Sequence, residues 1–88
     1  MPALSMFFGI IIYMYVEPNE PHHEPHIHAR YSGKEAIFSL SGKMLTKGFP
    51  RTQAQFVRTW IMIHESELKA NWELVSNGQP FFRIDPLK

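Results

Sequence analysis

The stretch HIHARYSGKEAIFS, residues 26–39, decides the fold. Ser32-Gly33 near its middle predicts a two-residue turn that joins two antiparallel strands. The turn fixes the expected cross-strand pairs, which are Tyr31 with Lys34, Arg30 with Glu35, Ala29 with Ala36, His28 with Ile37 and His26 with Ser39. In this register opposite charges meet on one face of the sheet, and apolar side chains from both strands share the other face.

The apolar run before this hairpin predicts one further strand over residues 6–16, with a bulge at Gly9. The run is apolar on both faces, so we expect it in the centre of the sheet or covered on both sides. It is about half as long as the ~20 residues of a membrane-spanning helix. A signal peptide has a basic segment before its apolar run, but no Lys or Arg precedes this one. The chain has no cysteine, and we expect a cytoplasmic protein without a membrane segment.

Proline and glycine mark the loops on either side of the hairpin. Residues 17–25 contain Pro18, Pro21 and Pro25, which predict a stiff loop. After the hairpin, Ser41-Gly42 predicts a second turn that leads into a short edge strand over residues 44–46.

A helix is expected from Pro50 or Thr52 up to Gly78. Its apolar face comprises Phe56, Val57, Trp60, Ile61 and Ile63. A continuous helix would bring the polar residues His64, Glu67 and Asn71 onto the same face. Two interpretations follow: the helix breaks near residues 64–66, or these polar groups line a site. A separate apolar stripe after this point favours the break. The tail, residues 79–88, has apolar side chains that can dock on the body, namely Phe81, Phe82 and Ile84.

These elements predict one α+β domain over residues 1–88. We expect an antiparallel meander of three to four strands, followed by two helices or one kinked helix packed on one face. With 44% apolar residues, the 88-residue chain can form a core.

The charges give no strong reason to expect nucleic-acid binding. Nine basic and eight acidic residues leave a net charge of +1. Arg51, Arg58 and Lys69 would line up along one side of a helix, but Glu65 lies in the same stripe. We therefore interpret the stripe as a solvated face that contributes little to nucleic-acid affinity, and do not expect nucleic acid to be a partner of the isolated domain.

The segment from His22 to His28 contains four of the five histidines of the chain. His26 and His28, two positions apart on a strand, would present both rings on one face and could share zinc or another divalent metal. His22 or His23, or a loop glutamate such as Glu20 or Glu24, would complete the ligand set. In the alternative interpretation, the histidines bond to the loop backbone or face solvent. We expect His26 and His28 to form a shallow, partly exposed patch away from the helix-covered core.

Acid–base chemistry has weaker support in the sequence. His28 with Glu35 or Glu24 could form a base with its orienting carboxylate, and His64 could join them if the helix packs nearby. The chain contains no nucleophile elbow, phosphate-binding loop or dinucleotide fingerprint. The sequence therefore leaves enzymatic activity undecided and favours a protein that is not an enzyme.

Several segments together resemble a small bacterial family, domain of unknown function 4160. They are Phe8-Gly9-Ile10-Ile11-Ile12, Glu24-Pro25-His26-Ile27-His28-Ala29, Gly33-Lys34-Glu35-Ala36, Asn71-Trp72-Glu73 and the Pro86-Leu87-Lys88 ending. Ile27 stands where the family pattern has an aromatic residue, and the preceding loop is longer and richer in histidine. The resemblance implies a compact cytoplasmic α+β protein, often encoded beside another small domain in arrangements like toxin–antitoxin modules. It implies no reaction or ligand.

The functional hypothesis is an interaction protein that binds a small partner protein in a toxin–antitoxin-like module. Its candidate binding residues are His26, His28, Arg30 and Glu35. A homodimer is an alternative assembly. The alternative function is a metal-binding protein, or a metal-dependent hydrolase or nuclease, that uses the histidines of residues 22–28.

Overall fold

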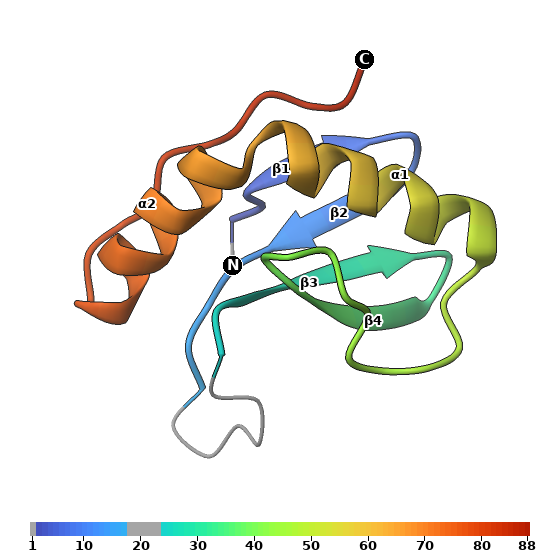
Figure 1. The fold of residues 1–88 in the computed structure, drawn as a ribbon, viewed down its shortest axis with the longest axis horizontal. Helices are drawn as coiled ribbons and strands as arrows, with labels where there is room; N and C mark the ends of the chain where they lie inside the picture. The colour runs from blue at the N-terminus through green and yellow to red at the C-terminus, as the bar shows by residue number, and fades with distance from the viewer. Residues whose placement is uncertain (1, 18–23) are drawn as a thin grey trace.

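A four-stranded antiparallel sheet covered on one face by two helices forms the protein. The computed structural model describes residues 2–17 and 24–88. In chain order the elements are β1 (Ser5–Phe7), β2 (Ile10–Tyr13), β3 (His26–Tyr31), β4 (Lys34–Ser39), α1 (Arg51–Ile63) and α2 (Glu65–Ser76). The strands lie in the order β1-β2-β3-β4, so the sheet is a meander (Figure 1). The predicted α+β class is confirmed.

The hairpin of β3 and β4 has the predicted register throughout. Arg30 lies opposite Glu35, and the other expected pairs are also present. Ser32 and Gly33 both have positive φ, 51° and 79°, as a type I′ turn requires. The turn and the alternation of side chains therefore agree, and together they fix which residues face the core.

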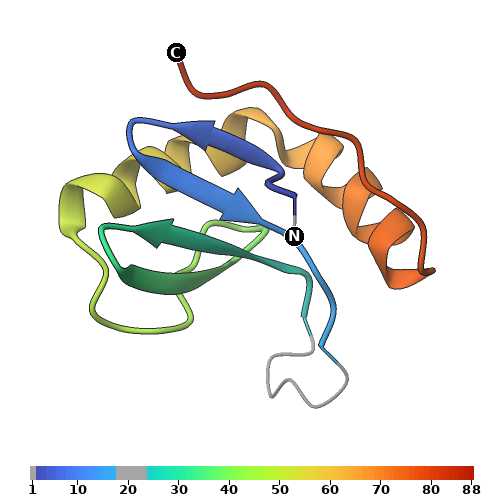
Figure 2. The same ribbon diagram turned by 180° about the vertical axis from the view of Figure 1, so that it is seen from behind.

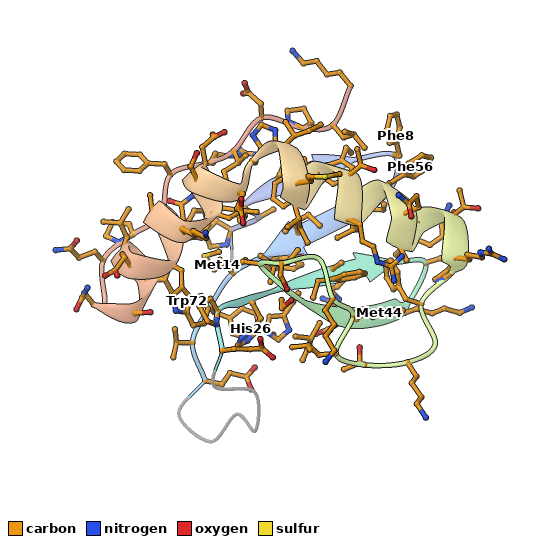
Figure 3. The ribbon with its side chains drawn as sticks, in the orientation of Figure 1. Phe8, Met14, His26, Met44, Phe56 and Trp72 are labelled. Atoms are coloured by element: carbon orange, nitrogen blue, oxygen red, sulfur yellow. The ribbon has the colours of Figure 1, made fainter. Side chains whose placement is uncertain are left out.

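The apolar run at the N-terminus forms a hairpin, so the prediction of one strand over residues 6–16 is wrong. Phe8 and Gly9 have φ values of 50° and 77° and make a tight turn between β1 and β2, where a bulge was expected. A phenylalanine at positive φ is unusual. The Phe8 ring lies 5.0 Å from the ring of Phe56 in α1, and this contact helps to hold the strained residue (Figure 3).

The predicted edge strand over residues 44–46 is reduced to one bridge, between Phe38 and Met44. The N–H of Leu45 still donates to the carbonyl of Ile37 at 2.7 Å. The N–H of Ile37 instead donates to the side-chain hydroxyl of Thr46. Because a side chain replaces the backbone at this point, the ladder ends after one pair.

The helix breaks at His64, within the predicted range. α1 ends at Ile63 and α2 begins at Glu65, with His64 at φ −109° and ψ 27° between them. Ile63 is 61% exposed, so its assignment to the apolar face is wrong. The buried face of α1 is centred on Val57, Trp60 and Ile61, and Ile63 lies to one side of it at 100° per residue. Asn71, which a continuous helix would bring onto that face, is buried and bonds to both backbone groups of Phe82 in the tail.

The core lies between the sheet and the helices. It contains Leu4, Phe7, Ile10, Ile12, Met14, Ile27, Ala29, Ala36, Phe38, Leu40, Phe49, Ala54, Val57, Trp60, Ile61, Leu68 and Ile84. In the tail, Ile84 docks as expected, whereas Phe82 is 73% exposed. Neither helix is long and apolar enough to cross a membrane.

Candidate functional site

The sheet face opposite the helices carries the predicted site residues. The cross-strand pairs bring Tyr13 beside His28, His28 beside Ile37, and Arg30 beside Glu35. Figure 2 views the molecule with this sheet in front of the helices. We call this surface the outer face.

His26 and His28 alternate with Ile27 and Ala29 as predicted, but they are buried. Their exposed fractions are only 2% and 3%, so the expectation of a partly exposed patch is wrong. The Tyr15 ring stacks on His28 at 4.1 Å and an interplanar angle of 12°. Strand periodicity assigns side chains to a face, but it does not tell what else covers that face.

His26 is also closer to the helices than expected. Its ring centroid lies 5.1 Å from that of Trp72 in α2. Figure 3 shows the two side chains side by side near the start of β3. The second helix therefore reaches the histidine pair, which we predicted to lie away from the helices.

One nitrogen of each histidine ring is held by an oxygen. The Nδ1 atom of His26 lies 2.7 Å from the backbone carbonyl oxygen of Glu24. The Nδ1 atom of His28 lies 3.1 Å from a carboxylate oxygen of Glu35, and the Tyr15 hydroxyl is 3.2 Å away. Since carbonyl and carboxylate oxygens only accept, Nδ1 carries the proton in both rings. In the neutral rings Nε2 is then left with a free lone pair.

Both Nε2 atoms are buried and lack a hydrogen-bond partner among the described residues. The His26 and His28 ring centroids are 5.2 Å apart, at an interplanar angle of 64°. Buried polar atoms are nearly always paired, so these two acceptors on neighbouring rings are unusual. Among the described residues, the hydroxyl oxygen of Ser5 is the other buried side-chain atom without a partner.

A polar hollow of about 230 Å³ opens on the outer face beside His28. It is lined by Tyr13, Tyr15, Arg30 and Glu35. The two oxygens of Glu35 contact different partners, because Oε2 faces His28 and Oε1 lies 3.7 Å from Nε of Arg30. The carboxylate thus links the exposed hollow to the buried histidine.

The structure brings together His26, His28, Arg30 and Glu35, the four predicted binding residues. Of the two carboxylates proposed to orient His28, Glu35 does so, whereas Glu24 holds His26 through its backbone. The predicted metal ligands His22 and His23, with Glu20, lie outside the described residues. Within residues 2–17 and 24–88, no group of three or more metal-ligating side chains could hold an ion.

Sequence reasoning missed three aromatic residues of the site, Tyr13, Tyr15 and Trp72. The two tyrosines alternate with Ile12 and Met14, which are both buried in the core. This alternation indicates that one face of the strand packs in the core and that the other carries the tyrosine hydroxyls. Trp72 carried no such signal, because its contact with His26 depends on how α2 turns after the break.

His64 and two of the three cations in the basic stripe have structural partners, whereas Arg51 is exposed. His64 lies 2.6 Å from a carboxylate oxygen of Glu67, and its ring packs against Trp60. In the basic stripe, Arg58 donates to the carbonyl of Gly42 and Lys69 pairs with Glu65 at 3.4 Å. The helix break also divides the stripe between α1 and α2.

The family model described as "Domain of unknown function (DUF4160)" matches residues 9–73 of the chain. This range contains the histidine pair and every residue that lines the polar hollow. The comparisons with curated proteins and with solved structures gave no match.

Proposed function

This chain belongs to the DUF4160 family, and we propose that it is a small interaction protein that binds a partner protein through the polar hollow. The observation that carries the proposal is the lining of the hollow by Tyr13, Tyr15, Arg30 and Glu35 on the outer face. Tyrosine and arginine are over-represented among the residues that dominate binding energy at protein interfaces.

The size of the hollow favours a partner's side chain over a small-molecule substrate. Its volume of about 230 Å³ is below the ~300–1,000 Å³ that is usual for ligand pockets, which are also mostly apolar. A shallow hollow edged by hydroxyl and charged groups fits one or two side chains that protrude from another protein.

Arg30 indicates the chemistry of the partner. Its side chain is 60% exposed, and its ion pair with Glu35 involves Nε at a separation of 3.7 Å. The two terminal nitrogens of the guanidinium can therefore bind a carboxylate in a bidentate manner. We propose that the partner inserts an acidic side chain beside Arg30. Tyr13 then packs against the partner residues next to that acidic side chain.

The partner in this proposal is the small protein encoded beside the chain, in a cytoplasmic toxin–antitoxin-like module. The family resemblance supports this arrangement, and the polar hollow on the outer face supplies a surface for it. A homodimer that uses the same hollow is the competing assembly.

The test is to co-express the chain with the protein encoded by the adjacent gene and to measure the affinity of the purified pair. Arg30→Ala and Tyr13→Ala should each weaken binding at least tenfold, which is about 1.4 kcal/mol for an interface residue of this kind. Lys47→Ala is the matched control, because it removes an exposed cation outside the hollow.

Two results would overturn the proposal. One is a pair whose affinity is the same with Arg30→Ala and Tyr13→Ala as with the wild type. The other is the absence of binding to the neighbouring protein, with sedimentation showing a dimer of the chain that Arg30→Ala dissociates. Thermal unfolding of each variant checks that the fold is intact.

A further inference from the structure

The buried histidine pair has a feature that the partner-binding proposal does not use. Each Nδ1 atom is fixed by an oxygen of Glu24 or Glu35, whereas each Nε2 atom is buried without a partner among the described residues. Metal-binding histidines usually have this arrangement, in which one ring nitrogen donates to a carbonyl or carboxylate and the other binds the ion.

The two Nδ1 partners lie on opposite sides of the pair. Glu24 precedes His26 in the chain, whereas Glu35 lies opposite Arg30, beyond His28 in the strand. The proton on each Nδ1 atom leaves the lone pair of each Nε2 atom free. The two rings that carry these buried Nε2 atoms are neighbours, with centroids 5.2 Å apart.

We propose that His26 and His28 bind one divalent transition-metal ion of the zinc class through their Nε2 atoms. Imidazole is a preferred ligand of zinc, copper and nickel, and a neutral ring with Nε2 free needs no rearrangement to bind them. Glu35 and the Glu24 carbonyl hold the rings in the binding tautomer. The ring of Tyr15 covers one side of the pair and Trp72 packs on His26.

The site supplies two protein ligands from the part of the chain that the structure describes. No third His, Cys, Asp or Glu in residues 2–17 and 24–88 completes a group that could hold an ion. Water or a small anion then fills the other positions of a tetrahedral ion. Such a site is exchangeable, and it binds more weakly than a structural zinc site with four protein ligands.

The test is a calorimetric titration of zinc into protein without an affinity tag. The wild type should bind one equivalent, and His26→Gln and His28→Gln should each weaken binding at least tenfold, since even outer-shell changes cost about 10–100-fold. His64→Gln is the matched control, because His64 also has a carboxylate at Nδ1, from Glu67, but lies in the helical layer. Its affinity should equal that of the wild type.

A second measurement does not depend on the folding of the variants. Nitrogen-15 NMR of the imidazoles in the wild type should show protonated Nδ1 atoms in His26 and His28, and zinc should shift both Nε2 signals. If zinc leaves these signals unchanged, the proposal is overturned, and a buried water bonded to the two Nε2 atoms is the remaining explanation.

A third variant distinguishes this site from the rest of the histidine-rich segment. Zinc binding that disappears in His22→Ala/His23→Ala but persists in both glutamine variants would also overturn the proposal. The metal-binding inference is independent of the partner-binding proposal. The first is tested by the affinity for zinc, and the second by the affinity for the neighbouring protein.

Discussion

The indole N–H of Trp60 donates a 2.8 Å hydrogen bond to the backbone carbonyl of Asp85, a residue 25 positions further along the chain. The same ring lies 5.4 Å from the ring of Phe7 in β1 and is fully buried. One side chain of α1 therefore contacts the edge of the sheet and also fixes the C-terminal tail. It reinforces a direct contact between the same two parts of the fold, in which the N–H of Ile84 donates to the carbonyl of Leu4.

Replacement of Trp60 should have a large effect on stability. Trp60→Ala should lower the free energy of unfolding by about 3–5 kcal/mol, because it leaves a large cavity in the core. Trp60→Phe should cost about 1–3 kcal/mol, mainly because the carbonyl of Asp85 loses its donor. Urea unfolding followed by circular dichroism measures both values. Equal losses in the two variants would show that the ring volume contributes little.

The turn between β1 and β2 can be compared with the turn between β3 and β4. Alanine at Gly9 or Gly33 would have to adopt positive φ, at a cost of about 1–2 kcal/mol. At Gly9 the new Cβ would also lie 3.3 Å from a ring carbon of Tyr31, whereas at Gly33 it would meet nothing within 4 Å. Gly9→Ala should therefore lower the midpoint of thermal unfolding more than Gly33→Ala. The reverse order would contradict this packing.

Asn71 should hold the C-terminal tail against α2. Its amide group donates to the carbonyl of Phe82 and accepts from the N–H of Phe82, both at 2.9 Å. Asn71→Ala removes both bonds and should cost about 2 kcal/mol. Asn71→Asp should also destabilise the tail, because a carboxylate oxygen would face the Phe82 carbonyl. Amide hydrogen exchange at Phe82 should become faster in both variants, and unchanged protection there would refute the role.

Arg58 and Lys69 should contribute to structure more than to nucleic-acid binding. Arg58 donates to the Gly42 carbonyl at 3.2 Å and lies over the Phe38 ring, so Arg58→Ala should cost about 1–2 kcal/mol in urea unfolding. Arg51→Ala, at an exposed site, should change stability by less than about 0.5 kcal/mol. Neither Arg58→Ala nor Lys69→Ala should alter weak DNA or RNA binding by the isolated domain. A large loss with steep salt dependence would contradict this.

The hairpin of β3 and β4 could be predicted in full because independent signals agreed. The turn at Ser32-Gly33, the alternation of side chains and the pairing of Arg30 with Glu35 all require one register. The helix break at His64 was the favoured one of two interpretations, because a separate apolar stripe after this point indicated that the second half of the helix is rotated. Local sequence patterns are enough to predict the structure where every alternative register or helix orientation would bury polar side chains.

The hairpin of β1 and β2 could not be predicted in the same way. Phe8-Gly9 is not a typical turn sequence, because phenylalanine seldom adopts positive φ, and its contact with Phe56 involves a residue far along the chain. The burial of His26 also depends on a distant residue, Trp72, whose position follows from the angle of α2. Periodicity gave the face of these residues correctly, but their exposure depends on long-range packing.

The segment after β4 determines which backbone groups remain free at that edge of the sheet. The backbone N–H and C=O groups of Ile37 and Ser39 are bonded to residues 42–46, and the carbonyl of Leu4 beside β1 accepts a hydrogen bond from Ile84 in the tail. Sheets with open edges can recruit strands from other molecules, which leads to strand addition or to aggregation. Here the chain itself occupies the outward backbone groups of Ile37 and Ser39 in β4, and the carbonyl of Leu4. Addition of a strand from another molecule along β4 is therefore disfavoured, so that a protein approaching this edge meets side chains and not free backbone groups.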